Sequence, residues 1–242
     1  RFSSRQPSRK KNATIQWRAG RWAFLGSLLG IVFALIMFMP ARWLAYGVAK
    51  ATAGQVQLTS TSGTVWNGSA QLMPTGGAQS RDATSLPGRV QWHLSPRWMG
   101  ASVEIMSDCC AQKPLTGQAK FGWQHFELQF QNHTSQWPTS LLQGLGSPWN
   151  TLQLNGQLSL RLDQFGIQWN DGRTRLDGKL IAALQNASSS LTTVSPMGSY
   201  QAVIEGSDTP TLQILTDKGP LQIKGQGQWT GQRLRFNGQA ST

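Results

Sequence analysis

Hydrophobic and polar residues alternate with a period of two through most of the chain after residue 55. The hydrophobic positions of this pattern are Val90, Trp92 and Leu94; Phe126, Leu128 and Phe130; Leu152, Leu154, Leu158, Leu160 and Leu162; Leu212 and Ile214; Leu221 and Ile223; and Leu234 and Phe236. Such alternation turns one face of each strand towards an apolar interior and leaves the other in water, as in antiparallel sheets. We therefore predict an antiparallel, hairpin-rich all-β domain over residues 55–242, with the leucines from 152 to 162 on its inner face.

Turn-forming residues separate the alternating stretches. Asn170-Asp171-Gly172, Asp177-Gly178 and Asp217-Lys218-Gly219 combine glycine with residues that tolerate a positive φ. Helical periodicity is faint and confined to residues 139–145, and the alanine-rich stretch 44–54 is expected to be a linker or a helix extension. We expect less than about a fifth of the β domain to be helical.

One stretch departs from this pattern. Residues 22–41 hold no charged side chain over 20 positions, a length that reaches roughly 30 Å as an α-helix, which is the thickness of a bilayer's hydrocarbon core. Trp22 and Trp43 lie at its two ends, where indole rings prefer the headgroup level. The pattern predicts one transmembrane helix over residues 22–43. A cleaved signal peptide is the alternative, but its apolar region is shorter, about 7–15 residues.

The formal net charge of +12 is concentrated before this stretch. Seven Lys and Arg residues lie in residues 1–21, whereas only Arg42 and Lys50 closely follow the apolar stretch. Because positively charged flanks stay in the cytoplasm, we expect residues 1–21 to form a cytoplasmic tail and residues 44–242 to lie outside. In a Gram-negative bacterium this describes a single-pass inner-membrane protein with a periplasmic domain. No basic stripe recurs beyond residue 21, which argues against nucleic acid as a partner.

Candidate chemistry is sparse. The sequence has no zinc-protease, nucleophile-elbow, P-loop or Cys-x-x-Cys motif, and its ten acidic residues are scattered. The three histidines, His93, His125 and His133, have no companion ligands at metal spacing. The pattern argues against an enzyme and against a bound cofactor or metal ion.

Two short motifs allow more than one interpretation. Cys109 and Cys110 are adjacent, and in an oxidising compartment they form either a vicinal disulfide or two free or intermolecular thiols. Gly26 and Gly30 give the apolar stretch a small-xxx-small face on which a partner helix could pack closely, although this spacing is also common in lone anchors.

Several strings are similar to those of a known family. The string Gly63-Thr64-Val65-Trp66-Asn67-Gly68 follows the apolar stretch closely, and Trp92 to Pro96, continued by Trp98-Met99-Gly100, gives a W-x-L-x-P element with a later glycine. The late strings contain Gly198 and Tyr200, then Gly219, Pro220, Leu221, Gly225, Gly227 and Trp229. Over roughly residues 20–240, the chain resembles the N component of the bacterial type II secretion system.

This resemblance implies an inner-membrane accessory or scaffold component, without enzymatic chemistry, whose partners are other inner-membrane components of the secretion machinery. We interpret Gly63 and Gly68 as turn residues and Trp66 as a ring packed beneath them. An alternative from another class is a periplasmic lipid-binding or lipid-transfer protein of AsmA-like type, in which a curved open sheet holds lipid on its apolar face. Alternation predicts the inner face without saying what fills it.

Overall fold

The computed structural model describes residues 14–77, 80, 82–147, 149–170, 173–231 and 233–241. The predicted cytoplasmic tail lies outside this part as far as residue 13, as do the side chains of residues 14–21 and the turn residues 171–172. The chain divides into two compact units, Arg1–Met39 and Pro40–Thr242.

The first unit contains one helix, α1 (Thr14–Met37). Its large apolar side chains are exposed from Trp22 onwards. No helix in the described part of the chain has both the length and the apolar character needed to cross a bilayer. α1 ends before the predicted boundary at residue 43, because Pro40 lacks an N–H and begins a second helix, α2 (Ala41–Ala51). α2 occupies most of the stretch expected to be a linker or a helix extension.

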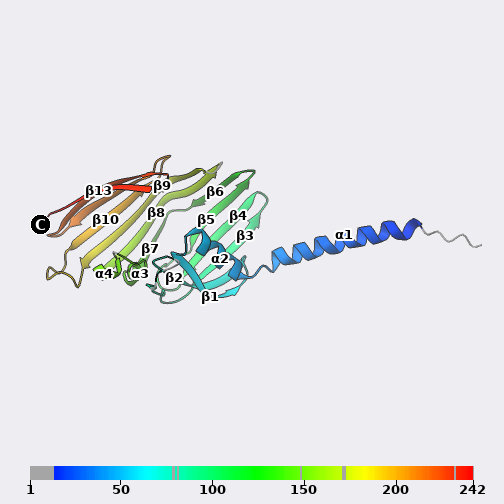
Figure 1. The fold of residues 1–242 in the computed structure, drawn as a ribbon, viewed down its shortest axis with the longest axis horizontal. Helices are drawn as coiled ribbons and strands as arrows, with labels where there is room; N and C mark the ends of the chain where they lie inside the picture. The colour runs from blue at the N-terminus through cyan, green and yellow to red at the C-terminus, as the bar shows by residue number, and fades with distance from the viewer. Residues whose placement is uncertain are drawn as a thin grey trace, which may run out of the picture. The chain divides into compact units, whose positions relative to one another are not determined.

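The second unit is built on one open sheet, and its strands all pair antiparallel. The strands are β1 (Val56–Gly63), β2 (Asn67–Pro74), β3 (Val90–Arg97), β4 (Gly100–Ser107), β5 (Leu115–Gly122), β6 (His125–Phe130), β7 (His133–Pro138), β8 (Asn155–Asn170), β9 (Arg173–Ser188), β10 (Gly198–Glu205), β11 (Thr211–Lys218), β12 (Gln222–Thr230) and β13 (Arg233–Ser241). They lie side by side almost in chain order (Figure 1). The prediction of an antiparallel, hairpin-rich β structure is confirmed.

The one departure from chain order occurs at β8, which is long enough to pair with both β6 and β7. Its register shifts between Asp163 and Gly166, opposite the interruption between these two strands. Gln164 bulges there with a φ of 47°. Its backbone N–H donates to the Asn132 side chain at 2.8 Å, and its carbonyl accepts from the Gln129 amide at 2.8 Å, so the bulge leaves no unpaired backbone group at this residue.

The two faces of the sheet differ in character, because paired residues point to the same face. Apolar side chains that are cross-strand neighbours follow one another across one face of the sheet. They form three series: Trp92, Ile105 and Leu115; Ala119, Leu128, Ile167 and Leu176; and Leu180, Ile204, Leu212 and Phe236. The opposite face carries polar and charged partners, among them the ion pairs Lys120–Glu127 and Lys179–Glu205. We call these the apolar face and the polar face.

Helices and loops cover the apolar face where the sheet begins. Ala41 of α2 is buried with Ala70 and Trp92, and Leu44 packs against the same cluster. A second cluster joins Leu86 and Cys110 to Leu141 of α3 (Ser140–Gly144), so the faint helical periodicity over 139–145 corresponds to a short helix. From β8 onwards the apolar side chains of this face are mostly half-buried.

The predicted leucine face is correct in part. Leu158 is buried and Leu160 and Leu162 are half-buried on the apolar face of β8. Leu152 instead ends the short helix α4 (Trp149–Leu152), and the buried Leu154 lies just before the strand. The strand prediction at Leu152 is therefore wrong, because Gln153 adopts a φ of 44° and breaks the alternation there.

Candidate functional site

The turns between strands lie at two opposite edges of the sheet. The connections β1–β2, β3–β4, β5–β6, β8–β9, β10–β11 and β12–β13 lie at one edge, which we call the hairpin edge. The connections β2–β3, β4–β5, β7–β8 with α3 and α4, β9–β10 and β11–β12 lie at the other, which we call the far edge (Figure 1). The family-like strings of the sequence lie at both edges. Residues 63–68 are at the hairpin edge, and Gly198 and Gly219 are at the far edge.

The string from Gly63 to Gly68 forms the tight β1–β2 turn. Gly63 has a φ of 85°, and a Cβ on it would contact the Asn67 carbonyl oxygen. Thr64 closes the turn, since its N–H donates to the Asn67 carbonyl at 2.9 Å and its hydroxyl accepts from the Asn67 N–H at 3.1 Å. Gly63 is therefore required by backbone geometry.

The ring against Gly68 belongs to Trp92, which differs from the expectation that Trp66 packs there. A Cβ on Gly68 would lie 2.6 Å from Cζ2 of Trp92, its cross-strand partner. The Trp92 Nε1–H donates to the Val65 carbonyl at 3.0 Å. Trp66 is half-buried, and its carbonyl accepts from the Leu94 N–H at 2.6 Å. Sequence alone does not distinguish these two rings, because the register of β2 on β3 decides which of them meets the glycine.

The second family-like string assembles around two glycines at the far edge. A Cβ on Gly219 would contact Cα of Gly198 and would lie 2.6 Å from the Met197 carbonyl oxygen. The Tyr200 hydroxyl donates to the Leu221 carbonyl at 3.2 Å, and the Leu221 N–H donates to the Met197 carbonyl at 3.2 Å. These contacts close the turn through Pro220, so the string has a structural role.

The glycines of β12 make room for one aromatic ring. Cβ atoms on Gly225 and Gly227 would both contact the Phe236 ring, at 3.1 Å for Gly227. Phe236 is the partner of Gly227 on β13, and Trp229 is the partner of Leu234. The remaining family-like residue, Pro96, is exposed near the end of β3. The role of Phe236 was missed at the sequence level, although an aromatic residue facing a Gly-x-Gly strand signals it.

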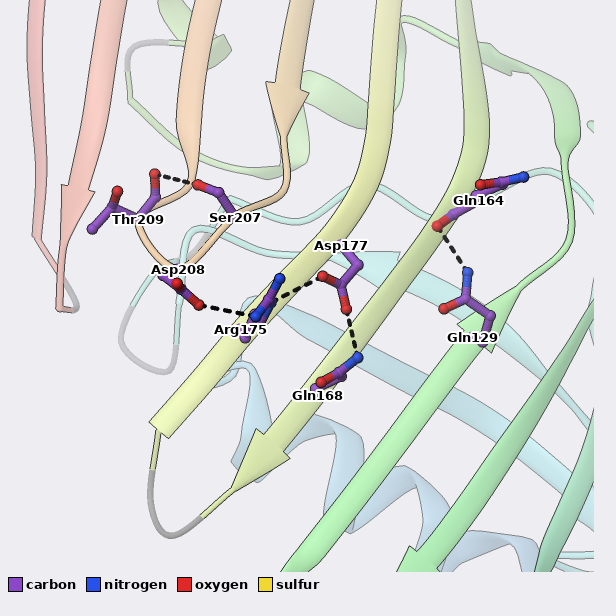
Figure 2. Close-up of polar contacts among 8 residues, drawn as sticks. All are labelled: Gln129, Gln164, Gln168, Arg175, Asp177, Ser207, Asp208 and Thr209. Carbon is purple, nitrogen blue, oxygen red and sulfur yellow. Dashed lines mark hydrogen bonds and ion pairs between the residues drawn. The ribbon is translucent and has the colours of Figure 1, made fainter.

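Charged residues on the polar face are paired with one another near the β8–β9 hairpin (Figure 2). Arg175 Nε lies 3.0 Å from Asp177 Oδ1, and its Nη1 lies 3.2 Å from Oδ1 of Asp208 in the β10–β11 connection. The Gln168 amide donates to the other Asp177 oxygen at 2.7 Å. Figure 2 shows these contacts and the Gln129–Gln164 bond as separate links between neighbouring segments. They join strands and a loop and supply no nucleophile with a base.

Two titratable groups are shifted by burial alone. Burial lowers the pKa of His133 on β7 and raises the pKa of the Tyr200 hydroxyl. No group of three or more His, Cys, Asp or Glu side chains suited to a metal ion occurs within the described residues. His93, His125 and His133 lie on three different strands, β3, β6 and β7.

Cys109 and Cys110 are bonded to each other at the far edge. Cys110 is buried with Leu86 and Leu141, whereas Cys109 is exposed. The Gln136 N–H donates to the Cys110 carbonyl at 2.9 Å, which fixes the loop to β7. The sequence left open a vicinal disulfide or two separate thiols, and the structure contains the vicinal disulfide. Its contacts hold the loop in place, which is a structural role.

The outer strands of the sheet differ in regularity. The register of β1 shifts between Thr59 and Ser62, and the Arg89 guanidinium donates to the Ser60 carbonyl at 2.7 Å, which holds this bulge against β2. β13 pairs with β12 through nine residues without a shift, and all nine are exposed. A regular outer strand presents unpaired N–H and C=O groups that an additional strand can complete, whereas a bulged one does not.

Comparison with known proteins identifies one family. The model of the family described as type II secretion system (T2SS), protein N matches residues 54–242. This range contains every strand of the sheet. No curated protein and no solved structure is found to match the chain.

Proposed function

The chain belongs to the type II secretion system protein N family, and we propose that it acts as an inner-membrane accessory or scaffold component of that machinery. The observation that carries this proposal is the family match over residues 54–242, the range of the whole sheet. The family is described as a component of the secretion system, which supports a role without enzymatic chemistry. We propose that contacts with other secretion components, in the membrane and in the periplasm, are the means by which the protein works.

The proposed membrane anchor is the uncharged stretch of residues 22–41, with the tail of residues 1–21 in the cytoplasm and the sheet in the periplasm. The support comes from the absence of charge over 20 residues and from seven basic residues before the stretch against Arg42 and Lys50 after it. A reporter that is active only after export, fused behind residue 242, tests the orientation. An inactive fusion together with an active cytoplasmic reporter at the same place would contradict it.

The first proposed contact surface is the small-residue face of α1. Cβ atoms built on Gly26 and Gly30 have no heavy atom within 4 Å, so a partner helix can approach closely along this face. Gly26→Leu with Gly30→Leu should reduce co-purification of the inner-membrane partners. Leu28→Phe, on the opposite side of the same helix, is the matched control and should retain them.

The second proposed contact surface is the outer side of β13. The Trp229 N–H donates to the Pro210 carbonyl, on the side of β12 that faces β11. The backbone N–H and C=O groups of the alternate residues of β12 therefore face β13. The antiparallel register of β13 on β12 then places the N–H groups of Leu234, Phe236, Gly238 and Ala240 on the outer side. Ala240→Pro removes one outward donor and no bond to β12. It should weaken strand addition by a partner, whereas Ala240→Val keeps the donor and should not.

The decisive experiment combines both surfaces in cells that depend on this protein for secretion. One variant has α1 exchanged for an unrelated anchor, a second has Ala240→Pro, and a third has both changes. We expect the partners captured after cross-linking, and the secreted enzyme in the medium, to fall in at least one single variant and furthest in the double variant. Unchanged capture and unchanged secretion in the double variant would reject the scaffold proposal.

A further inference from the structure

Two neighbouring hairpins at the hairpin edge carry solvent-exposed tryptophans at their tips. Trp98 in the β3–β4 turn has 98% of its surface exposed, and Trp123 in the β5–β6 turn has 95% exposed. Met99 and Phe121 beside them are also exposed. These are the large side chains that a soluble surface usually covers, and β4 and β5 pair directly, so the two tips are neighbours.

The residues around these tips are positively charged. Arg97 precedes Trp98 and is exposed, and Lys120 lies on the β5–β6 hairpin. The described acidic side chain on this hairpin is Glu127, which pairs with Lys120 at 3.4 Å. Indole rings with adjacent Arg and Lys side chains are the combination that proteins place at the headgroup level of a bilayer, where the ring sits in the interface and the cation meets phosphate.

The space between the two hairpins is an open, mainly apolar hollow of about 520 Å³. Trp98, Met99 and Phe121 line it, together with Ala101 and Ala119 from the apolar face and with Lys120. A hollow that is apolar inside and basic at its rim suits the junction between a lipid headgroup and its acyl chain.

The chain enters the sheet unit at this same edge. Pro40, the first residue of the unit, forms an antiparallel bridge with Thr64 in the β1–β2 turn. Trp43, one turn later on α2, is exposed and follows Arg42. The residues of the sheet unit that directly follow the proposed anchor in the chain therefore lie at its hairpin edge.

We propose that the β3–β4 and β5–β6 hairpin tips dock on the surface of an anionic bilayer, with Trp98 and Trp123 in the headgroup region and Arg97 and Lys120 on its phosphates. The choice of bilayer rests on the proposed anchoring of residues 22–41, but the chemistry of the tips does not. Docking places the hairpin edge of the sheet at the membrane surface and the far edge away from the lipid.

The test uses the full chain in proteoliposomes of phosphatidylcholine alone or of phosphatidylcholine mixed with phosphatidylglycerol. An environment-sensitive fluorescent amino acid is placed at Met99 or at Gln124, beside the two tryptophans, and lipids with a quencher at headgroup depth are added. Leu191, an exposed apolar residue of the far-edge β9–β10 connection, is the matched control position.

We expect quenching to be several-fold stronger at positions 99 and 124 than at position 191, and stronger with phosphatidylglycerol than without it. The double variant Trp98→Ala with Trp123→Ala should lower the quenching in both lipids. Arg97→Gln with Lys120→Gln should remove the increase due to phosphatidylglycerol, as should high salt. Both tryptophans are almost fully exposed, so unchanged circular dichroism and thermal unfolding serve as the folding control.

Two results would overturn the proposal. Absence of quenching at positions 99 and 124, with cross-links from these positions to secretion components in cells, would make the tips a protein-binding site. Equal quenching at positions 99, 124 and 191 would mean that the unit lies on lipid without a preferred edge.

Failure of the anchoring proposal is recognised separately. A protein that alkaline carbonate extracts from the proteoliposomes is not anchored by residues 22–41. If the extracted chain, added back to anionic vesicles, is still quenched at positions 99 and 124 and not at 191, the docking surface stands without the anchor.

Discussion

The indole ring of Trp92 fills the space beside Gly68, where a side chain would otherwise lie. The two residues are cross-strand partners, Cζ2 of Trp92 lies 2.6 Å from the place a Gly68 Cβ would take, and the Trp92 Nε1–H reaches the Val65 carbonyl at 3.0 Å. These two contacts of Trp92 join the β1–β2 turn to the buried cluster that contains Ala41 of α2. It explains why a glycine and a tryptophan some 24 positions apart belong to one structural unit.

We predict that Gly68→Ala destabilises the protein by about 1–3 kcal/mol, because the new methyl group overlaps a ring that is buried and cannot turn away. Urea unfolding of the full chain in detergent, followed by fluorescence, measures the change. Gly47→Ala on the exposed side of α2 is the control, since a Cβ there meets nothing within 4 Å, and it should stabilise by up to about 1 kcal/mol. Equal effects of the two substitutions would contradict the packing argument.

A second prediction ranks the two tryptophans. Trp92 is buried, so Trp92→Ala should cost about 3–5 kcal/mol through the cavity it leaves. Trp66 is only half-buried, so Trp66→Ala should cost less. The same unfolding measurement compares them. If Trp66→Ala proves the more damaging change, the contact with Gly68 does not dominate this part of the core.

A third prediction concerns the far-edge turn. Gly219→Ala should be strongly destabilising, by about 1–3 kcal/mol, because Gly219 has a φ of 133° and a Cβ would collide with Gly198. Tyr200→Phe removes only the hydroxyl that donates to the Leu221 carbonyl and should cost about 0.5–1.5 kcal/mol. Thermal unfolding should therefore show a larger loss of stability for Gly219→Ala than for Tyr200→Phe. The reverse result would mean that the hydrogen bond of Tyr200 contributes more to the stability of the turn than the conformation of Gly219 does.

A fourth prediction concerns acid. Burial lowers the pKa of His133 below its value in the unfolded chain, so the unfolded state binds a proton more readily, and the contribution of His133 to stability is lost as the pH falls through 6.5 towards the folded pKa. Lys113, Arg161 and Asp163 line the same hollow as His133. The free energy of unfolding should decline between about pH 7.5 and about pH 5.5.

His133→Gln should make this decline smaller, because glutamine does not titrate. His93→Gln, at an exposed position on β3, is the control and should leave the decline unchanged. An identical pH profile in the His133 variant and the parent would show that other groups cause the acid sensitivity.

Much of the sheet follows from local pattern. Alternation at Leu158, Leu160 and Leu162 specifies a strand with one apolar face, because side chains of an extended backbone point to opposite sides. Gly219 marks a turn between strands as predicted, whereas the turn predicted at Asp177-Gly178 is wrong, because both residues lie inside β9 opposite the β8 bulge. A chain that alternates strands with short turns pairs neighbouring strands antiparallel. The short helix at 139–145 follows from its own periodicity. These features depend on residues close together in the sequence, which is why they were predictable.

The sequence by itself determined the alternation, the turn at Gly219, the uncharged stretch of residues 22–41 and the strings that place the chain in its family. Tertiary structure decided that the Trp92 ring meets Gly68, that β8 pairs with both β6 and β7, and that Leu152 ends a helix. It also gathered Trp98 and Trp123 at one edge. The contact of Trp92 with Gly68 and the pairing of β8 depend on the register between strands, and a shift of one residue, which no local pattern reveals, moves every side chain to the other face.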